Sequence, residues 1–156
     1  MSKGKSRTGL YVTIAIIVIV IVVVGVAVAL MYKPGTSGSG TPLTLYAGEV
    51  SSAQYGFGNS ASTITSNPGP TLNLKVGTTY TMTVHNVGAM PHAWEITSDK
   101  AVGSALFGAE IDVTSYIQPG GSGSVTFTPD QAGNFYYICP VPGHIDFGMW
   151  GNVVVT

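Results

Sequence analysis

The sequence has a single cysteine and few charged residues, and both shortages exclude classes of protein. Cys139 is the only cysteine among 156 residues, so the chain cannot form an intramolecular disulfide or a zinc site with several thiolate ligands. Charged residues make up 8% of the chain, against roughly 25% in an ordinary soluble domain. Hydrophobic residues make up 45%, which excludes a disordered protein. No cluster of Lys and Arg follows the first seven residues, so the sequence predicts no nucleic-acid partner.

The basic residues are concentrated at the N-terminus, ahead of a long hydrophobic run. Residues 10–32 carry no charge over 23 positions, which is long enough for a helix that crosses a bilayer. Lys3, Lys5 and Arg7 precede this run, and the positive-inside rule places them in the cytoplasm. The sequence therefore predicts a cytoplasmic basic N-terminus over residues 1–9 and a single-pass transmembrane anchor in the cell membrane over residues 10–32.

An alternative for the hydrophobic run is a signal peptide that is removed, with a small-residue cleavage site at residues 27–29. We favour a retained anchor because the run is longer than the usual signal-peptide core of about 7–15 residues. Residues 33–42 are rich in Gly and Ser and predict a flexible linker. Both alternatives place residues 43–156 on the extracytoplasmic side of the membrane.

Residues 43–156 contain short runs that alternate hydrophobic and polar side chains and end at Gly, Pro or Asn. In residues 80–85, for example, Tyr, Met and Val alternate with Thr and His. Such runs predict strands, and their spacing predicts an antiparallel β-sandwich. Residues 99–110 break the pattern and predict a loop or one short helical turn. Residues 43–67 predict only an N-terminal strand region.

Three side chains that can bind a soft metal lie close together near the C-terminus. Four residues separate Cys139 from His144, and four more separate His144 from Met149. This stretch lies between two predicted strands, so the three side chains can converge at the tips of those strands. A second imidazole, His92, lies in a predicted turn after the strand that ends near His85. Two imidazoles, a thiolate and a thioether suit both Cu(I) and Cu(II), whereas methionine is not a usual ligand of zinc.

The sequence around these residues resembles the copper loop of the cupredoxins, the type 1 blue copper proteins. The resemblance covers residues 68–156 and rests on the Cys139-to-Met149 spacing, on the flanking GNFYYI and WGNVVV, and on PTLNLKVGTTYTMTVHNVGAMPHAWEIT upstream. Within that family the sequence is most similar to the rusticyanin, sulfocyanin and auracyanin group. The resemblance implies an all-β, cupredoxin-like Greek-key β-sandwich with one type 1 copper per chain. It also implies that His92, Cys139 and His144 are the equatorial ligands and Met149 the axial ligand.

One position departs from the family pattern. Many cupredoxins carry Asn or Ser after the first histidine ligand, whereas this sequence carries Ala93. The resemblance implies that the Ala93 amide donates a hydrogen bond to the Cys139 sulfur, with a second bond from the Val141 amide. Hydrogen bonds of this kind tune the reduction potential of a metal site.

Other residues that could carry chemistry are assigned to the surface or to the surroundings of the site. The alternation places His85 on the strand face opposite Met82, so we expect its side chain at the surface. Glu95 and Asp146 are also expected at the surface, because no second carboxylate accompanies either one as an acid–base partner would. Met90 is expected as a neighbour of the site rather than as a ligand.

The resemblance implies an electron carrier that is not an enzyme and has no small-molecule substrate. Electrons would pass through His144, which an apolar rim would surround: Pro140, Val141, Pro142, Ile145 and Phe147. The expected partners are membrane or extracytoplasmic redox proteins, such as a cytochrome or a terminal oxidase of a respiratory chain. The alternatives are a copper-handling protein of the cell envelope that stores or delivers the metal, and a metal-free interaction domain.

Overall fold

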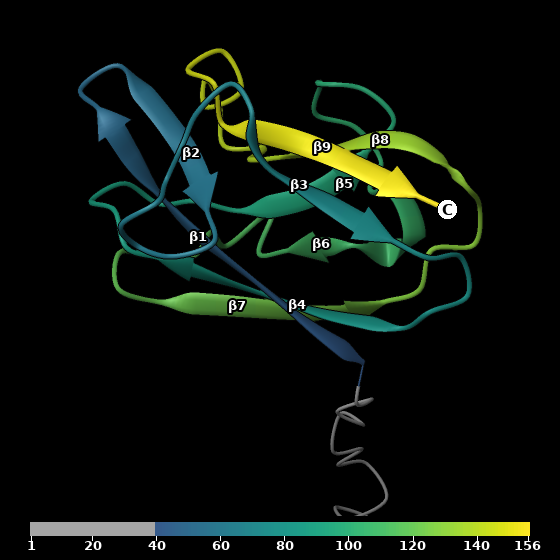
Figure 1. The fold of residues 1–156 in the computed structure, drawn as a ribbon. Helices are drawn as coiled ribbons and strands as arrows, with labels where there is room; N and C mark the ends of the chain where they lie inside the picture. The colour runs from purple at the N-terminus through teal and green to yellow at the C-terminus, as the bar shows by residue number, and fades with distance from the viewer. Residues whose placement is uncertain (1–39) are drawn as a thin grey trace, which may run out of the picture. The chain divides into compact units, whose positions relative to one another are not determined.

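The computed structural model describes residues 40–156, which form two β-sheets (Figure 1). In chain order, the elements are β1 (Thr41–Ser51), β2 (Gln54–Gly58), β3 (Gly69–Leu74), β4 (Tyr80–Asn86), β5 (Trp94–Thr97), the 3₁₀ turn η1 (Leu106–Gly108), β6 (Glu110–Ile111), β7 (Ser122–Phe127), β8 (Gly133–Ile138) and β9 (Trp150–Val155). One sheet has the strand order β2-β1-β4-β7 and the other β3-β9-β8-β5-β6. The described chain is therefore the all-β sandwich that the sequence predicts.

The predicted N-terminal segment and anchor, residues 1–9 and 10–32, lie outside the described residues. Within residues 40–156, no helix has the length and apolar character needed to cross a membrane. β1 begins at Thr41, inside the expected linker over residues 33–42, because Thr41 pairs with Tyr80 of β4.

β4 shows the predicted alternation of buried and exposed positions. Its even-numbered residues, from Tyr80 to Asn86, are buried, whereas the odd-numbered residues between them are half-buried. His85 is one of the half-buried residues, and its ring stacks on Tyr46 of β1 with the ring centroids 5.1 Å apart. The alternation therefore places His85 on the sheet face that points away from the core.

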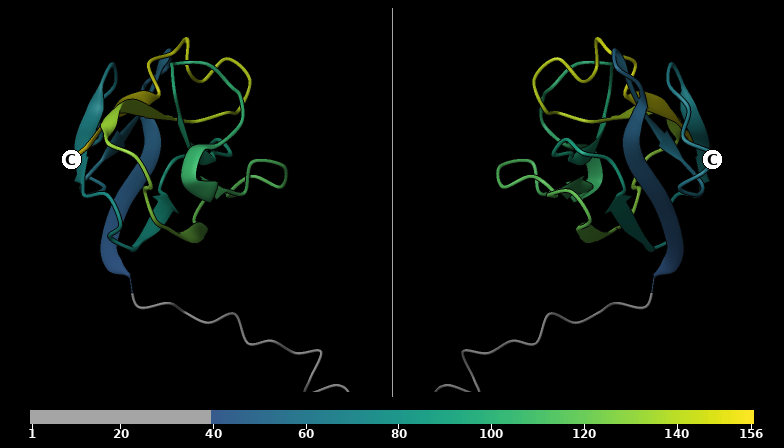
Figure 2. Two further views of the ribbon diagram at one scale, coloured as in Figure 1. Left: turned by 90° about the vertical axis from the view of Figure 1, so that its right-hand side faces the viewer. Right: turned by 90° about the vertical axis from the view of Figure 1, so that its left-hand side faces the viewer.

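The prediction of an antiparallel sandwich is wrong for two strand pairs. β1 runs parallel to β4, and β3 runs parallel to β9. Parallel neighbours need a crossover connection of about a dozen residues or more, and between β1 and β4 the chain passes through β3 in the opposite sheet. In Figure 2 the C-terminus lies beside β3, where the Thr156 amide donates to the Leu74 carbonyl at 3.0 Å. Alternation within one strand carries no information about the direction of its neighbour.

The N-terminal strand region contains β1, β2 and a loop over residues 59–68. β1 and β2 form an antiparallel hairpin, and Phe57 pairs with Thr65 in the following loop. The tip of this hairpin lies at the same end of the sandwich as residues 139–149, drawn in yellow (Figure 1). There the Tyr55 amide donates to the Phe147 carbonyl at 3.0 Å. The hairpin is therefore tied to the segment that carries the predicted ligands.

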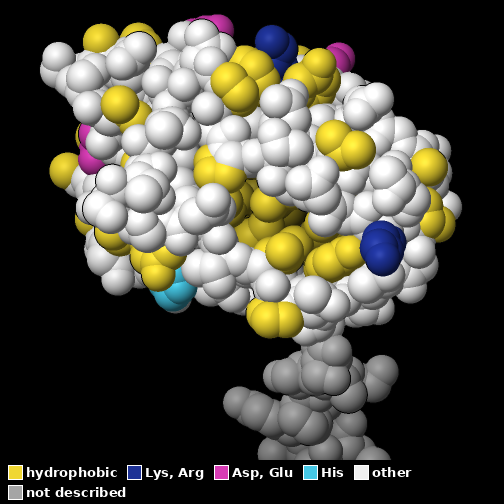
Figure 3. All heavy atoms as spheres, viewed as in Figure 1, with side chains coloured by type: hydrophobic (Ala, Val, Ile, Leu, Met, Phe, Trp, Pro, Cys, Tyr) yellow, Lys and Arg dark blue, Asp and Glu magenta, His cyan; other side chains and the backbone are white. Residues whose placement is uncertain are grey.

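The core is the apolar layer between the two sheets. Both sheets contribute to its largest fully buried side chains, which include Leu45, Phe57, Met82, Trp94, Tyr137 and Val153. Residues 99–110 contain η1 and the start of β6, as expected for a loop with one helical turn. The surface carries few charges, and Figure 3 shows Lys, Asp and Glu side chains scattered singly over one face.

Replacing Leu45 with alanine tests the packing of β1. Leu45 is fully buried, and we expect Leu45→Ala to lower the free energy of unfolding by about 2–5 kcal/mol, because it removes contacts and leaves a cavity. Chemical denaturation measures this change. The neighbouring Thr44 is exposed, so Thr44→Ala is the control and should change the free energy by less than about 1 kcal/mol. Equal losses in the two variants would contradict the orientation of β1.

Candidate metal centre

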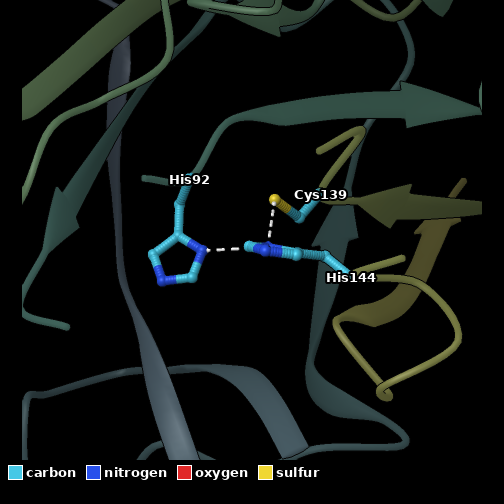
Figure 4. A group of neighbouring side chains, drawn as sticks. All are labelled: His92, Cys139 and His144. Carbon is cyan, nitrogen blue, oxygen red and sulfur yellow. Dashed lines mark hydrogen bonds between the residues drawn. The ribbon is translucent and has the colours of Figure 1, made fainter. Parts of the chain in front are cut away.

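Three buried donor side chains converge at the end of the sandwich that carries residues 139–149, here called the ligand loop. His92 lies in the turn between β4 and β5, Cys139 follows β8, and His144 lies within the ligand loop. Their ligand atoms all lie within 4.8 Å of one another (Figure 4). His92 and Cys139 are fully buried, and His144 is 4% exposed. The structure therefore brings together three of the four predicted ligands.

The donor atoms of these side chains face one another. Nδ1 of His92 and Nδ1 of His144 are 3.2 Å apart, and Sγ of Cys139 is 3.5 Å from Nδ1 of His144 (Figure 4). Ligand atoms bound to one ion at roughly 2.0–2.3 Å lie about 3–4 Å apart. The donor set therefore fits a shared metal ion, and thiolate with imidazole is a set that copper accepts.

Backbone pairing and one buried amide fix the turn that carries His92. His92 and Ile117 exchange two backbone hydrogen bonds, at 3.1 and 2.7 Å. The buried Asn86 side chain donates to the carbonyls of Met90 and Ile117, each at 2.8 Å, and accepts from the Gly88 amide at 2.9 Å. Asn86 thus satisfies two backbone groups of the turn and binds the carbonyl of Ile117 in the segment that faces it.

The ligand loop folds as consecutive tight turns between β8 and β9. Three of its amides, including that of His144, donate to carbonyls three or four residues earlier at 2.9–3.1 Å. Gly143 and Gly148 have φ angles of +83° and +90°, in the left-handed region that favours glycine. At the end of the loop, the Cys139 amide donates to the Met149 carbonyl at 3.1 Å. Local turns therefore return the chain to the point where the loop began.

Met149 is fully buried at the end of the ligand loop. Its amide donates to the His144 carbonyl at 2.9 Å, and its carbonyl accepts from the Cys139 amide. The backbone of Met149 is thus tied to two of the predicted equatorial ligands. Its role as the axial ligand stays a prediction, as do the individual ligand roles of His92, Cys139 and His144.

Burial favours the neutral form of both imidazoles and the protonated form of the thiol in the metal-free centre. Burial, together with the neighbouring His144, lowers the pKa of His92 to about 4. Burial also lowers the pKa of His144, and it raises the pKa of the Cys139 thiol to about 11. Neutral imidazoles can bind a metal directly, whereas the thiol must lose its proton when it becomes a ligand. The affinity for metal should therefore rise with pH.

Backbone amides surround the sulfur of Cys139 as expected. The Ala93 amide donates to Sγ at 3.4 Å, which confirms the hydrogen bond predicted at the position that lacks Asn or Ser. The Val141 amide also bonds the sulfur, and both bonds lower the pKa of the thiol against the larger effect of burial. These amides favour the thiolate form that binds metal.

The prediction that Glu95 lies at the surface is wrong. Glu95 is 3% exposed in β5, and its Oε1 atom has no hydrogen-bond partner. Burial raises the pKa of its carboxyl group, and the charge of Glu110, its cross-strand neighbour in β6, raises it further. All four residues of β5 are buried, so alternation does not separate an inner from an outer face there. Asp146 is exposed, as predicted.

The apolar rim expected around His144 is in part buried. Pro142 and Phe147 are exposed, Val141 and Ile145 are half-buried, and Pro140 is buried. The rim therefore presents fewer side chains to the solvent than the sequence predicts.

Two residues of the β1–β2 hairpin contact the segments that carry His92 and His144, and they were not identified from the sequence. Glu49 accepts hydrogen bonds from two amides in the turn ahead of His92. The Tyr55 ring packs against His144 with the ring centroids 4.3 Å apart. Both lie in the N-terminal strand region, and their partners lie tens of residues away, so no local pattern identifies them.

The chain is similar to several known copper proteins. Residues 69–156 match the family described as copper-binding proteins of the plastocyanin/azurin family. Auracyanin-B of Chloroflexus aurantiacus is 46% identical over 43 residues, which make up 28% of this chain and 18% of that protein. The chain thus matches less than a fifth of the length of this relative.

Solved structures share the fold. Auracyanin A, described as a "blue" copper protein of the green thermophilic photosynthetic bacterium Chloroflexus aurantiacus, is 23% identical with a TM-score of 0.51, over 74% of this chain and 99% of that chain. The copper-containing nitrite reductase of Thermus scotoductus is 26% identical with a TM-score of 0.50, over 74% of this chain and 27% of that chain.

The low pKa of His92 predicts how the stability of the metal-free protein depends on pH. Between about pH 6.5 and pH 4 the unfolded chain binds a proton at His92 that the folded chain does not bind. The free energy of unfolding should therefore fall as the pH falls through this range, by roughly 1–3 kcal/mol. Urea denaturation at several pH values measures this. His92→Asn should weaken the dependence, whereas a flat profile for the unmodified protein would contradict the assignment.

Proposed function

Because this chain belongs to the plastocyanin/azurin family of copper-binding proteins, we propose that it is a blue copper electron carrier that accepts and releases one electron at a time. Copper is its cofactor, and when bound it supplies the chemistry by alternating between Cu(I) and Cu(II). The protein would shuttle electrons between redox partners on the extracytoplasmic face of the membrane.

The burial of the three converging donors is the observation that carries this proposal. His92, Cys139 and His144 are between 0% and 4% exposed, so a bound metal would be enclosed by protein. The turns and backbone pairs around the donors hold them in place from several strands. An enclosed, rigid donor set favours electron exchange with little movement of the ligands over rapid exchange of the metal itself.

The residues of the centre would each perform a defined task. The two imidazoles stay neutral because burial lowers the pKa of both, so protons do not compete for their lone pairs near neutral pH. The amides of Ala93 and Val141 stabilise negative charge on the sulfur of Cys139. Hydrogen bonds to a ligating sulfur raise or lower the reduction potential, so these two amides help to set it.

We propose that a membrane anchor over residues 10–32 holds the copper domain close to the membrane. The uncharged run and the basic residues ahead of it support this proposal. The partners would be membrane or extracytoplasmic redox proteins, such as a cytochrome or a terminal oxidase. The exposed side chains of Pro142 and Phe147 near His144 suit a brief encounter of small area.

The chain would act without a substrate of its own. It contains three histidines and one cysteine, and two of those histidines and the cysteine are used in the centre. The remaining histidine, His85, stacks on Tyr46 outside the donor cluster. Copper enzymes such as nitrite reductases and multicopper oxidases need further histidine clusters, which three histidines cannot supply.

An absorption spectrum with added Cu(II) tests the copper centre. The full chain in detergent should develop an intense blue band from thiolate-to-copper charge transfer, and the band should vanish on reduction. Cys139→Ala should lack the band because it removes the thiolate. His85→Ala is the matched control, since it removes a histidine outside the cluster, and it should keep the band. A colourless protein that still binds copper would contradict the proposal.

A comparison of two rates separates an electron carrier from a protein that stores or delivers copper. We expect the reduced protein to pass its electron to an oxidised c-type cytochrome much faster than it loses copper to a Cu(I) chelator, because the donors are enclosed. Stopped-flow spectroscopy measures the first rate and chelator absorbance the second. Slow electron exchange with rapid loss of copper would favour the copper-handling alternative.

A further inference from the structure

We propose that the β1–β2 hairpin supplies two positioning residues for the copper centre, Glu49 for the turn that carries His92 and Tyr55 for the ligand loop that carries His144. The inference rests on the proposed copper centre. It gives a positioning role to a part of the chain that precedes the family match at residues 69–156. Each residue reaches a different ligand-bearing segment, and the pairing of β1 with β2 links the two.

The carboxylate of Glu49 binds the turn ahead of His92. It accepts from the Ala89 amide at 3.0 and 3.1 Å and from the Met90 amide at 2.9 Å. These amides lie two and three residues before His92 and have no strand partner. Hydrogen bonds to a carboxylate are stronger than those between neutral groups, and they lower the pKa of Glu49 against the effect of burial. Glu49 therefore holds the turn at neutral pH.

The approach of the turn to β1 depends on a glycine. A Cβ at Gly88 would overlap the Glu49 carboxylate and lie 2.9 Å from Cα of Gly48. The Val87 amide donates to the Ala47 carbonyl at 2.9 Å, so the turn is also tied to β1 through the backbone. Glycine at position 88 thus leaves room for the Glu49 carboxylate. The contact therefore depends on the sequence of the turn as well as on Glu49.

The ring of Tyr55 covers His144. The ring centroids are 4.3 Å apart with an interplanar angle of 36°, and the Tyr55 and His92 rings form an edge-to-face pair with centroids 6.0 Å apart. Phe147 packs edge-on against the same ring at 5.5 Å. The Tyr55 amide donates to the Phe147 carbonyl at 3.0 Å. Side chain and backbone of one residue therefore hold the ligand loop at two points.

The pairing of β1 with β2 links the contact of Glu49 to the contact of Tyr55. Glu49 and Tyr55 are direct partners in the antiparallel β1–β2 pair, so their side chains lie on the same face of the hairpin. Glu49 holds the turn of His92, and Tyr55 holds His144. The Nδ1 atoms of these two histidines are 3.2 Å apart. The side chain of Ala93 offers no polar group to link these segments. The hairpin thus fixes the separation of the two imidazoles from outside the ligand loop.

Substitutions at Tyr55 test its contact with His144 in the copper-loaded full chain. Tyr55→Leu removes the ring, and the copper release rate to a chelator should rise by about 10-fold or more, with a changed Cu(II) EPR spectrum. Tyr55→Phe keeps the ring and should restore both. The control is Tyr46→Leu, which breaks a tyrosine–histidine stack of similar geometry at His85, outside the centre. Equal release rates and spectra for Tyr55→Leu, Tyr46→Leu and the unmodified protein would overturn the assignment of Tyr55.

Hydrogen exchange tests the contact between Glu49 and the turn of His92 without copper. In the metal-free full chain, the amides of Ala89 and Met90 should be protected, and Glu49→Gln should speed their exchange by about 10-fold. Asp130→Asn, which removes an exposed carboxylate beyond the end of β7, is the control. Unchanged exchange in Glu49→Gln would overturn the assignment of Glu49. If the unmodified protein gives no blue band, the proposed function fails, but this readout still decides whether the hairpin holds the turn.

Discussion

Three polar donors buried around one point are the constraint on which the rest of the structure depends. A buried polar group without a partner destabilises a protein, so His92, Cys139 and His144 can lie inside an apolar sandwich only if their surroundings compensate. Compensation comes from the amides that bond the cysteine sulfur, from the lowered pKa of both imidazoles and from the turns that orient them, while Nε2 of His92 has no hydrogen-bond partner within the described chain. The loops at this end of the sandwich are arranged around these donors.

Strand pairing brings residues that are far apart in the sequence into contact. Glu95 pairs with Ile138 in the antiparallel pair β5–β8, so the start of β5 lies beside the end of β8. This register sets the amide of Ala93 against the sulfur of Cys139, 46 residues further along the chain. The β8–β9 pair does the same for the two ends of the ligand loop. The geometry of the centre is therefore a property of the sheet as much as of the loop.

The parts that could be predicted from the sequence are those with a local cause. Cys139, His144 and Met149 are close in sequence, and alternation identified the strands and placed His85 on the outer face of β4. The parallel pairs were missed because strand direction is set by crossovers, not by side-chain alternation. Burial of Glu95 was missed because β5 is covered on both faces. Glu49 and Tyr55 were missed because their partners lie tens of residues away, and no pattern within the hairpin points to them.

The position of the hairpin in the chain limits how far the ligand loop can be treated as a transferable module. β2 ends at Gly58, well before the ligand loop begins. A loop with the same sequence, transplanted into another sandwich, would bring its own turns and its two glycines with positive φ. It would leave behind the ring that covers His144 and the carboxylate that holds the turn of His92. The smallest portable unit of this centre is therefore three segments distant in sequence: the hairpin, the turn of His92 and the ligand loop. A graft of the ligand loop alone would rebuild three of the four predicted ligands without His92 and without their alignment.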